Sequence, residues 1–183
     1  MSNVVEIEAL FQAGLRAFGK IDIVVANAGI EKVNIQVVDV TEEDFDLLFR
    51  VNTKGPYFVM QAAARHIADG GRIINIASSS TSRPQPGLGL YGTSKSAPKY
   101  LVRVLAQEIG HRKVTVNSLV PGPIDGAGIF TGVGDDDPYK KSLLETIPIG
   151  RLAKAQDIAE FLASDQSFFI TGEEILMNGG SSN

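Results

Sequence analysis

The stretch "IDIVVANAG", residues 21–29, is the part of this chain from which its fold is most directly predicted. The run from Ile21 to Ala26 is short, rich in β-branched side chains and almost continuously hydrophobic. Such a run is typical of a strand that is buried on both faces of a parallel sheet. The small and polar residues Asn27 to Gly29 then indicate a turn at the carboxyl end of that strand.

Helical patterns lie on either side of this strand. In residues 4–18, apolar side chains recur at steps of three and four, which predicts an amphipathic helix that ends at Gly19. A second helix is expected from Thr41, which belongs to the residue types that cap helices, to about His66. A bend is expected in it near Gly55 and Pro56.

The alternation of strands and helices continues along the chain. Further strands are expected over residues 72–77, 114–120 and 173–178, and further helices over residues 91–109 and 155–163. Residues 121–150 are rich in proline and glycine and indicate a mobile loop with short helical pieces. This order predicts an α/β fold, a Rossmann-like parallel sheet of about four strands with helices on both faces, in a single domain of residues 1–183.

Composition narrows the classes of protein to consider. The 183 residues carry a formal net charge of -4 and no basic cluster, so no nucleic-acid partner is expected. Because there is no cysteine, disulfides and thiolate metal sites are excluded. The acidic run Asp135 to Asp137 has no histidine nearby and is interpreted as a solvated loop rather than a metal site. No run is apolar enough for a membrane span and the start lacks a signal pattern, so a cytoplasmic protein with no membrane partner is expected.

Two motifs overlap in "GLGLYGTSK", residues 87–95. One is the G-x-G-x-x-G pattern of a dinucleotide-binding loop, and the other is Y-x-x-x-K. A phosphate-binding loop should follow a strand directly, whereas the preceding residues are proline-rich, so the glycines are interpreted as turn residues. Tyr91 and Lys95 would share one face of a helix, where the ammonium group should lower the pKa of the phenol and make the pair useful for acid–base chemistry.

Three of the predicted strands end in small or polar residues: Asn27 to Gly29, Ser78, and Pro121 to Ile124. Ligands of parallel α/β sheets bind at the carboxyl ends of the strands, so these residues are expected to meet at one site. Ser79 and Ser80 are the alternatives to Ser78. A Ser-His-Asp hydrolase is a weak third possibility, because no G-x-S-x-G elbow surrounds Ser78.

The ordered set of motifs resembles the short-chain dehydrogenase/reductase (SDR) family. The matching segments run through essentially the whole chain: "ANAG" (26–29), "VNTKG" (51–55), "INIASS" (74–79), "YGTSK" (91–95), "VPGPI" (120–124) and "ITGEEILMNGG" (170–180). The resemblance implies an NAD(P)-dependent oxidoreductase that interconverts a carbonyl and an alcohol by hydride transfer. It does not distinguish NADP from NAD.

The resemblance also implies roles for four catalytic residues. Tyr91 would exchange a proton with the substrate oxygen, and Lys95 would lower the pKa of Tyr91 and hold the nicotinamide ribose. Ser78 would hydrogen-bond the substrate oxygen. Asn52 would position a water molecule in a proton relay.

Further roles concern the cofactor, the substrate and assembly. The resemblance places Asn27, Ala28 and Gly29 near the adenosine side of the cofactor. It places Pro121, Gly122 and Ile124 beside the nicotinamide, together with Tyr91 and Lys95. Residues 121–150 would form a lid over a small ketone or alcohol substrate, and the protein would form homo-oligomers.

The sequence also departs from the family pattern. The T-G-x-x-x-G-x-G loop of the family is not found, which predicts a domain truncated at its N-terminus. Without this loop, cofactor binding should be weak. Strand 21–26 should have an open apolar edge, which favours self-association. The alternative is therefore a noncatalytic remnant that acts only as an assembly partner. Gly126 stands where the family usually has threonine, and Pro98 should kink its helix by leaving the Ser94 carbonyl without its usual donor.

Overall fold

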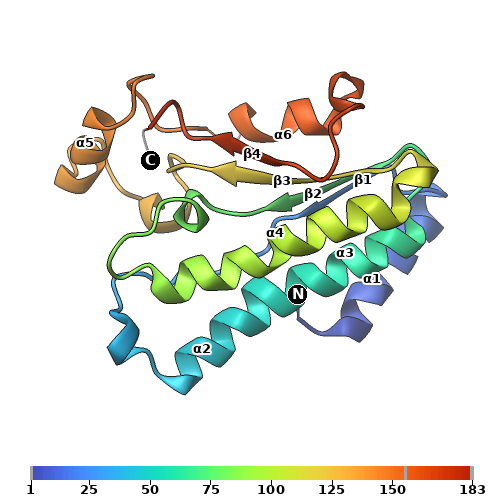
Figure 1. Cartoon of the computed structure of the whole chain (residues 1–183), viewed down its shortest axis with the longest axis horizontal. Coiled ribbons are helices and arrows are strands. Elements are labelled where there is room, and N and C mark those ends of the chain that lie inside the picture. Colours follow the sequence, from blue (N-terminus) through green and yellow to red (C-terminus); the bar gives the residue numbers. More distant parts are fainter. Residues whose placement is uncertain (1, 155, 182–183) are drawn as a thin grey trace.

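In the computed structural model, which describes residues 2–154 and 156–181, one parallel four-stranded sheet forms the centre of the chain (Figure 1). Its strands, in spatial order, are β1 (Ile23–Ala26), β2 (Arg72–Ile76), β3 (Thr115–Pro121) and β4 (Glu174–Met177). Each strand therefore pairs with the next one along the chain, and each connection contains at least one helix. The predicted α/β, Rossmann-like fold with four parallel strands is confirmed.

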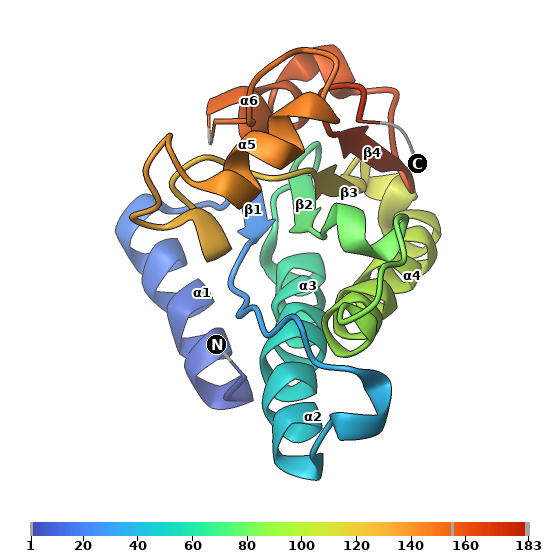
Figure 2. The same cartoon turned by 90° about the vertical axis from the view of Figure 1, so that its left-hand side faces the viewer.

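Helices cover both faces of this sheet (Figures 1 and 2). The helices are α1 (Val4–Phe18), α2 (Glu42–Phe49), α3 (Gly55–His66), α4 (Gly89–Ile109), α5 (Pro138–Glu145) and α6 (Gln156–Ala163). On one face, α1, α3 and α4 bury the larger hydrophobic core, whose members include Met60, Ile73 and Val102. On the other face, α6 packs Leu162 against Ile74 and Leu119. The α5 helix lies beyond the carboxyl ends of the strands.

The burial of β1 differs from the prediction. Val24 and Ala26 are buried beneath the helices, but Ile23 and Val25 remain 46% and 43% exposed. The expectation of burial on both faces is therefore wrong. The reason is that β1 is an edge strand, while α6 packs over β2 and β3.

The segment expected as one bent helix from Thr41 to His66 consists of three pieces. The Thr41 hydroxyl accepts a hydrogen bond from the Asp44 N–H at 3.2 Å and caps α2 as predicted. Between α2 and α3 lies a π-helical turn, Arg50–Lys54. Such turns widen a helix locally and often occur at functional sites. Here the turn contains Asn52, whose side chain is fully buried.

The segment 121–150 has its own small core. It contains a 3-10 turn, Gly128–Phe130, and α5, and Phe130 packs with Ile147 and Leu152. The acidic run in this segment is used structurally: Asp135 and Asp136 form ion pairs with the lysines of α5, and the Asp137 carboxylate caps that helix. These carboxylates therefore have partners within their own segment.

Candidate active site

The carboxyl ends of the strands bring most of the predicted site residues to one edge of the sheet. Asn27 to Gly29 follow β1, Ser78 follows β2, and Gly122 follows β3. The α4 helix starts at this same edge, so its first turns carry Tyr91 and Lys95 toward the strand ends. The site is thus assembled from the three connections between the strands.

Ser78 and Tyr91 form the centre of this arrangement. The Ser78 side chain lies close enough to the Tyr91 phenol to lower its pKa, and the Ser78 hydroxyl accepts hydrogen bonds from the Ser80 N–H at 3.2 Å and the Ser80 hydroxyl at 3.0 Å. Of the three consecutive serines, the structure thus brings Ser78 to Tyr91, while Ser80 fixes the orientation of Ser78. The catalytic role implied for Ser78 stays a prediction.

The electrostatic environment of Tyr91 differs from the prediction. Burial, and after it the Glu31 carboxylate, raise the pKa of Tyr91 to about 12, while Ser78 acts in the opposite direction. The expectation that Lys95 lowers this pKa is therefore wrong. The ammonium group of Lys95 is directed instead to the Ile76 carbonyl, to which it donates at 3.1 Å.

Lys95 lies deep beside this pair. Its side chain is buried, and burial lowers the pKa of Lys95, an effect that the Glu31 carboxylate opposes. A Cβ atom on Gly29 would lie 2.8 Å from the Lys95 Nζ and 3.2 Å from the Asn52 Oδ1. A side chain at position 29 would therefore displace the Lys95 ammonium group, because the loop after β1 passes close to these two side chains.

Asn52 connects that loop to α4. Its Oδ1 accepts from the Ile30 N–H at 2.9 Å, and its Nδ2 donates to the Ile30 carbonyl at 2.9 Å and to the Ser94 hydroxyl at 3.0 Å. Because the π-helical turn directs this fully buried amide between the two elements, Asn52 fixes the position of residues 29–30 relative to the Tyr91 helix. The water-positioning role implied for Asn52 stays a prediction.

Two residues at this edge were not identified from the sequence. Ser94 is completely buried and receives the Asn52 amide. The Glu31 carboxylate accepts a hydrogen bond from the Ile129 N–H at 3.1 Å and acts on the pKa values of both Tyr91 and Lys95. The available signal was the position of Glu31, a charged residue directly after "ANAGI" at the carboxyl end of a strand.

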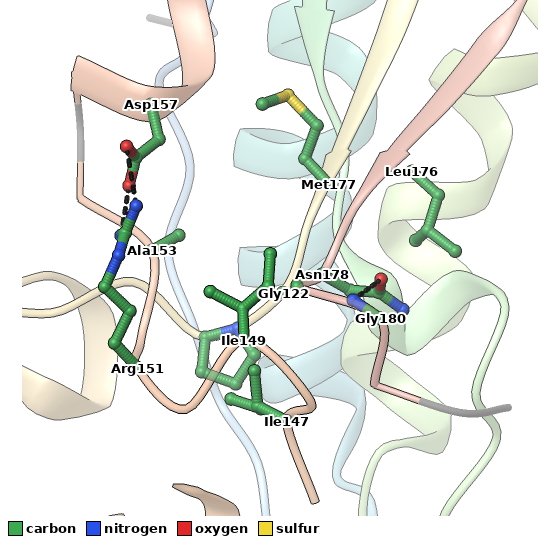
Figure 3. Close-up of a pocket in the computed structure, with 12 residues that line it drawn as sticks. Gly122, Ile147, Ile149, Arg151, Ala153, Asp157, Leu176, Met177, Asn178 and Gly180 are labelled. Atoms are coloured by element: carbon green, nitrogen blue, oxygen red, sulfur yellow. Dashed lines mark hydrogen bonds and ion pairs between the residues drawn. The ribbon is translucent and has the colours of Figure 1, made fainter.

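The residues predicted beside the nicotinamide are divided between two environments. Ile124 forms a parallel bridge with Ala153 and packs against the α6 side of the sheet, whereas Gly122 lines a cavity of about 320 Å³. Figure 3 shows this cavity between the ends of β3 and β4, with the Arg151–Asp157 ion pair on one side and Leu176 and Asn178 on another. The four predicted catalytic side chains are not part of its lining.

Comparison with known proteins agrees with this arrangement. The sequence model of the family described as enoyl-(acyl carrier protein) reductase matches residues 1–182. The hydroxynaphthalene reductase-like protein Arp2 of Metarhizium brunneum is 38% identical over 99% of this chain and 73% of its own length. A short-chain type dehydrogenase/reductase of Picea abies is 35% identical over 96% of this chain and 66% of its own length.

Solved structures show the same relationship. A short-chain dehydrogenase/reductase from Serratia marcescens superposes with a TM-score of 0.90 at 33% identity and covers 100% of this chain and 74% of that chain. A putative short-chain alcohol dehydrogenase from Sinorhizobium meliloti superposes with a TM-score of 0.88 at 35% identity, over 98% of this chain and 73% of that chain. The chain belongs to the short-chain dehydrogenase/reductase family and is an enzyme of the oxidoreductase type. None of the helices in the described part of the chain is long and apolar enough to cross a membrane.

Proposed function

We propose that this protein catalyses the NAD(P)-dependent interconversion of a small-molecule ketone and the corresponding alcohol, with Tyr91 as the group that exchanges the proton. The observation that carries the proposal is that Ser78, Tyr91 and the buried Lys95 come together at the carboxyl edge of the sheet. The family relationship supports an oxidoreductase and does not favour a noncatalytic assembly partner.

The residues present fit a nicotinamide cofactor. An ammonium group has three donors, and within the described residues Lys95 donates one hydrogen bond, to Ile76, so donors remain for ribose hydroxyls. Gly29 and Gly122 offer bare backbone at two strand ends, where a planar ligand can approach closely.

We assign Asn27, Ala28 and Gly29 to the adenosine side. We assign Pro121, Gly122 and Ile124 to the nicotinamide side. When bound, the cofactor supplies or accepts the hydride.

The protein groups then handle the proton and the substrate oxygen. In ketone reduction the Tyr91 phenol donates its proton to the oxygen, and the Ser78 hydroxyl donates a hydrogen bond to the same oxygen. Lys95 holds the ribose of the cofactor with its remaining donors, and Asn52 keeps the loop after β1 in register with α4. Residues 121–150 act as the lid that covers the substrate, and the protein works as a cytoplasmic homo-oligomer.

The decisive test is the substitution Tyr91→Phe. It should lower ketone reduction with NADPH or NADH by about 10²–10⁴-fold, the usual contribution of a positioned acid–base group. Tyr100→Phe is the matched control, because Tyr100 lies on the same helix but is 71% exposed, and it should leave the rate unchanged. Equal turnover in Tyr91→Phe and in the unmodified protein would refute the proposed role.

A further inference from the structure

Glu31 is the one charged side chain in the described part of the chain that contacts the segment 121–150 and also acts electrostatically on the Tyr91–Lys95 pair. It lies in the loop after β1, and its Oε2 accepts the Ile129 N–H at 3.1 Å. The two residues are 98 positions apart in the sequence, so this hydrogen bond joins the body of the protein to the proposed lid.

The lid turn is shaped to meet this carboxylate. Gly128 has a φ of 57°, which favours glycine, and a Cβ atom there would lie 2.7 Å from the Glu31 Oε2. A side chain at position 128 would therefore push the carboxylate away from the Ile129 N–H. The close approach of the turn and Glu31 thus depends on a bare backbone at the point of contact.

The turn is also rigidly attached to the rest of the lid. Phe130 is buried, and its ring stacks on Tyr139 of α5 at a centroid distance of 6.0 Å. The buried ammonium group of Lys140 lies 2.7 Å from both the Asp125 and the Asp135 carboxylates. Because these contacts join residues 125–140 into one unit, holding the turn at Ile129 holds the lid as a whole.

We propose that Glu31 is a positioning residue that fastens the lid over the Tyr91–Lys95 pair, and that its negative charge makes the closed site select neutral substrates over anionic ones. The selection between substrates rests on the proposed function, whereas the contact between Glu31 and the lid does not depend on it. The hydrogen bond to Ile129 holds the Glu31 carboxylate at the junction of the lid and the loop after β1, and the raised pKa of Tyr91 and the opposed lowering of the Lys95 pKa agree with a negative charge near these groups. An anionic group on the substrate would be repelled by the negative charge of Glu31.

Two substitutions separate the hydrogen bond from the charge. Glu31→Gln keeps a carbonyl oxygen that can accept the Ile129 N–H but removes the charge, whereas Glu31→Ala removes both. Hydrogen exchange of the Ile129 amide, followed by NMR, should accelerate about three- to tenfold in Glu31→Ala and much less in Glu31→Gln, as expected for loss of a partly exposed hydrogen bond. Glu108→Gln, an exposed position at the far end of α4, is the control for charge.

The selectivity is measured with ethyl acetoacetate as the neutral probe and acetoacetate as the anionic one. The ratio of kcat/KM for the neutral over the anionic probe should fall about fivefold in both Glu31 variants, the size of one charge interaction at a partly exposed site. In Glu31→Ala alone, KM should also rise for both probes with little change in kcat. The rise of alcohol oxidation with pH should move to lower pH in both variants, because the Glu31 charge that raises the pKa of Tyr91 is then absent.

Each outcome bears on one part of the inference. Unchanged exchange at Ile129 in Glu31→Ala overturns the lid contact, and an unchanged selectivity ratio overturns the charge selection. If neither the unmodified protein nor the variants convert either probe, the proposed function fails, while the hydrogen-exchange experiment still decides the lid contact. In that case, titration of the two probes against the Ile129 amide signal measures the selectivity without turnover, and equal affinities would overturn it.

Discussion

At the scale of single residues, the pKa of Tyr91 differs from the value that a neighbouring lysine alone would suggest. A lysine four positions away on a helix suggests a phenol with a lowered pKa. In the folded chain, burial of the ring and the Glu31 carboxylate dominate and raise the pKa of Tyr91 to about 12. The phenol is therefore held in its protonated form, which is the form needed to donate a proton to a ketone.

This raised pKa predicts opposite pH dependences for the two directions of the reaction. Because a group with a raised pKa keeps its proton to higher pH, ketone reduction should not lose kcat/KM between about pH 7 and about pH 10. Alcohol oxidation needs the phenolate and should rise about tenfold per pH unit over this range. The measurement is kcat/KM at saturating cofactor in both directions. A plateau of the oxidation profile near neutral pH would contradict a raised pKa in the working enzyme.

At the scale of elements, the π-helical turn and the proline in α4 form one connection. Pro98 has no N–H to offer the Ser94 carbonyl, which was the reason to expect a kink. In the structure the Thr53 hydroxyl donates to that carbonyl at 2.8 Å. The widened turn that contains Asn52 thus also supplies the donor that α4 lacks. This hydrogen bond joins the turn to the part of α4 that carries Tyr91 and Lys95.

A double-mutant cycle tests this connection. Thr53→Val removes the donor and leaves a buried carbonyl without a partner, so the free energy of unfolding should fall by about 1–3 kcal/mol in urea denaturation. Adding Pro98→Ala restores an N–H that can bond Ser94 within the helix, so the second change should recover much of this loss. Simple additivity of the two changes would show that the Ser94 carbonyl does not couple them.

Local patterns predicted the elements but not their environments. The helix caps at Gly19 and Thr41, the four strands and the position of Ser78 beside Tyr91 depend on short-range periodicity and on where parallel strands end, which the sequence displays directly. The exposure of Ile23, the donor for Ser94 and the contact between Glu31 and Ile129 depend on which distant segment lies opposite each residue. No local pattern encodes that information.

At the scale of the whole molecule, β1 is an edge strand with partly exposed apolar side chains, which leaves it open to further contacts. Its outer side chains Ile23 and Val25 are about half exposed, and a neighbouring apolar residue, Phe18 at the end of α1, is 82% exposed. An exposed edge strand with apolar side chains offers unpaired backbone groups to another chain. The expected homo-oligomerisation therefore has a specific candidate surface.

Val25→Lys tests whether this surface drives self-association. A charge on the exposed side of β1 should disfavour strand pairing with a second chain, so the weight-average sedimentation coefficient should depend less on protein concentration than in the unmodified chain. Val38→Lys is the matched control, because Val38 is 91% exposed but lies in a short 3-10 turn away from the sheet. If both substitutions have the same effect, the change in net charge explains it. If only Val25→Lys reduces association, the open edge of β1 is the contact, because the two variants differ only in where the charge is placed.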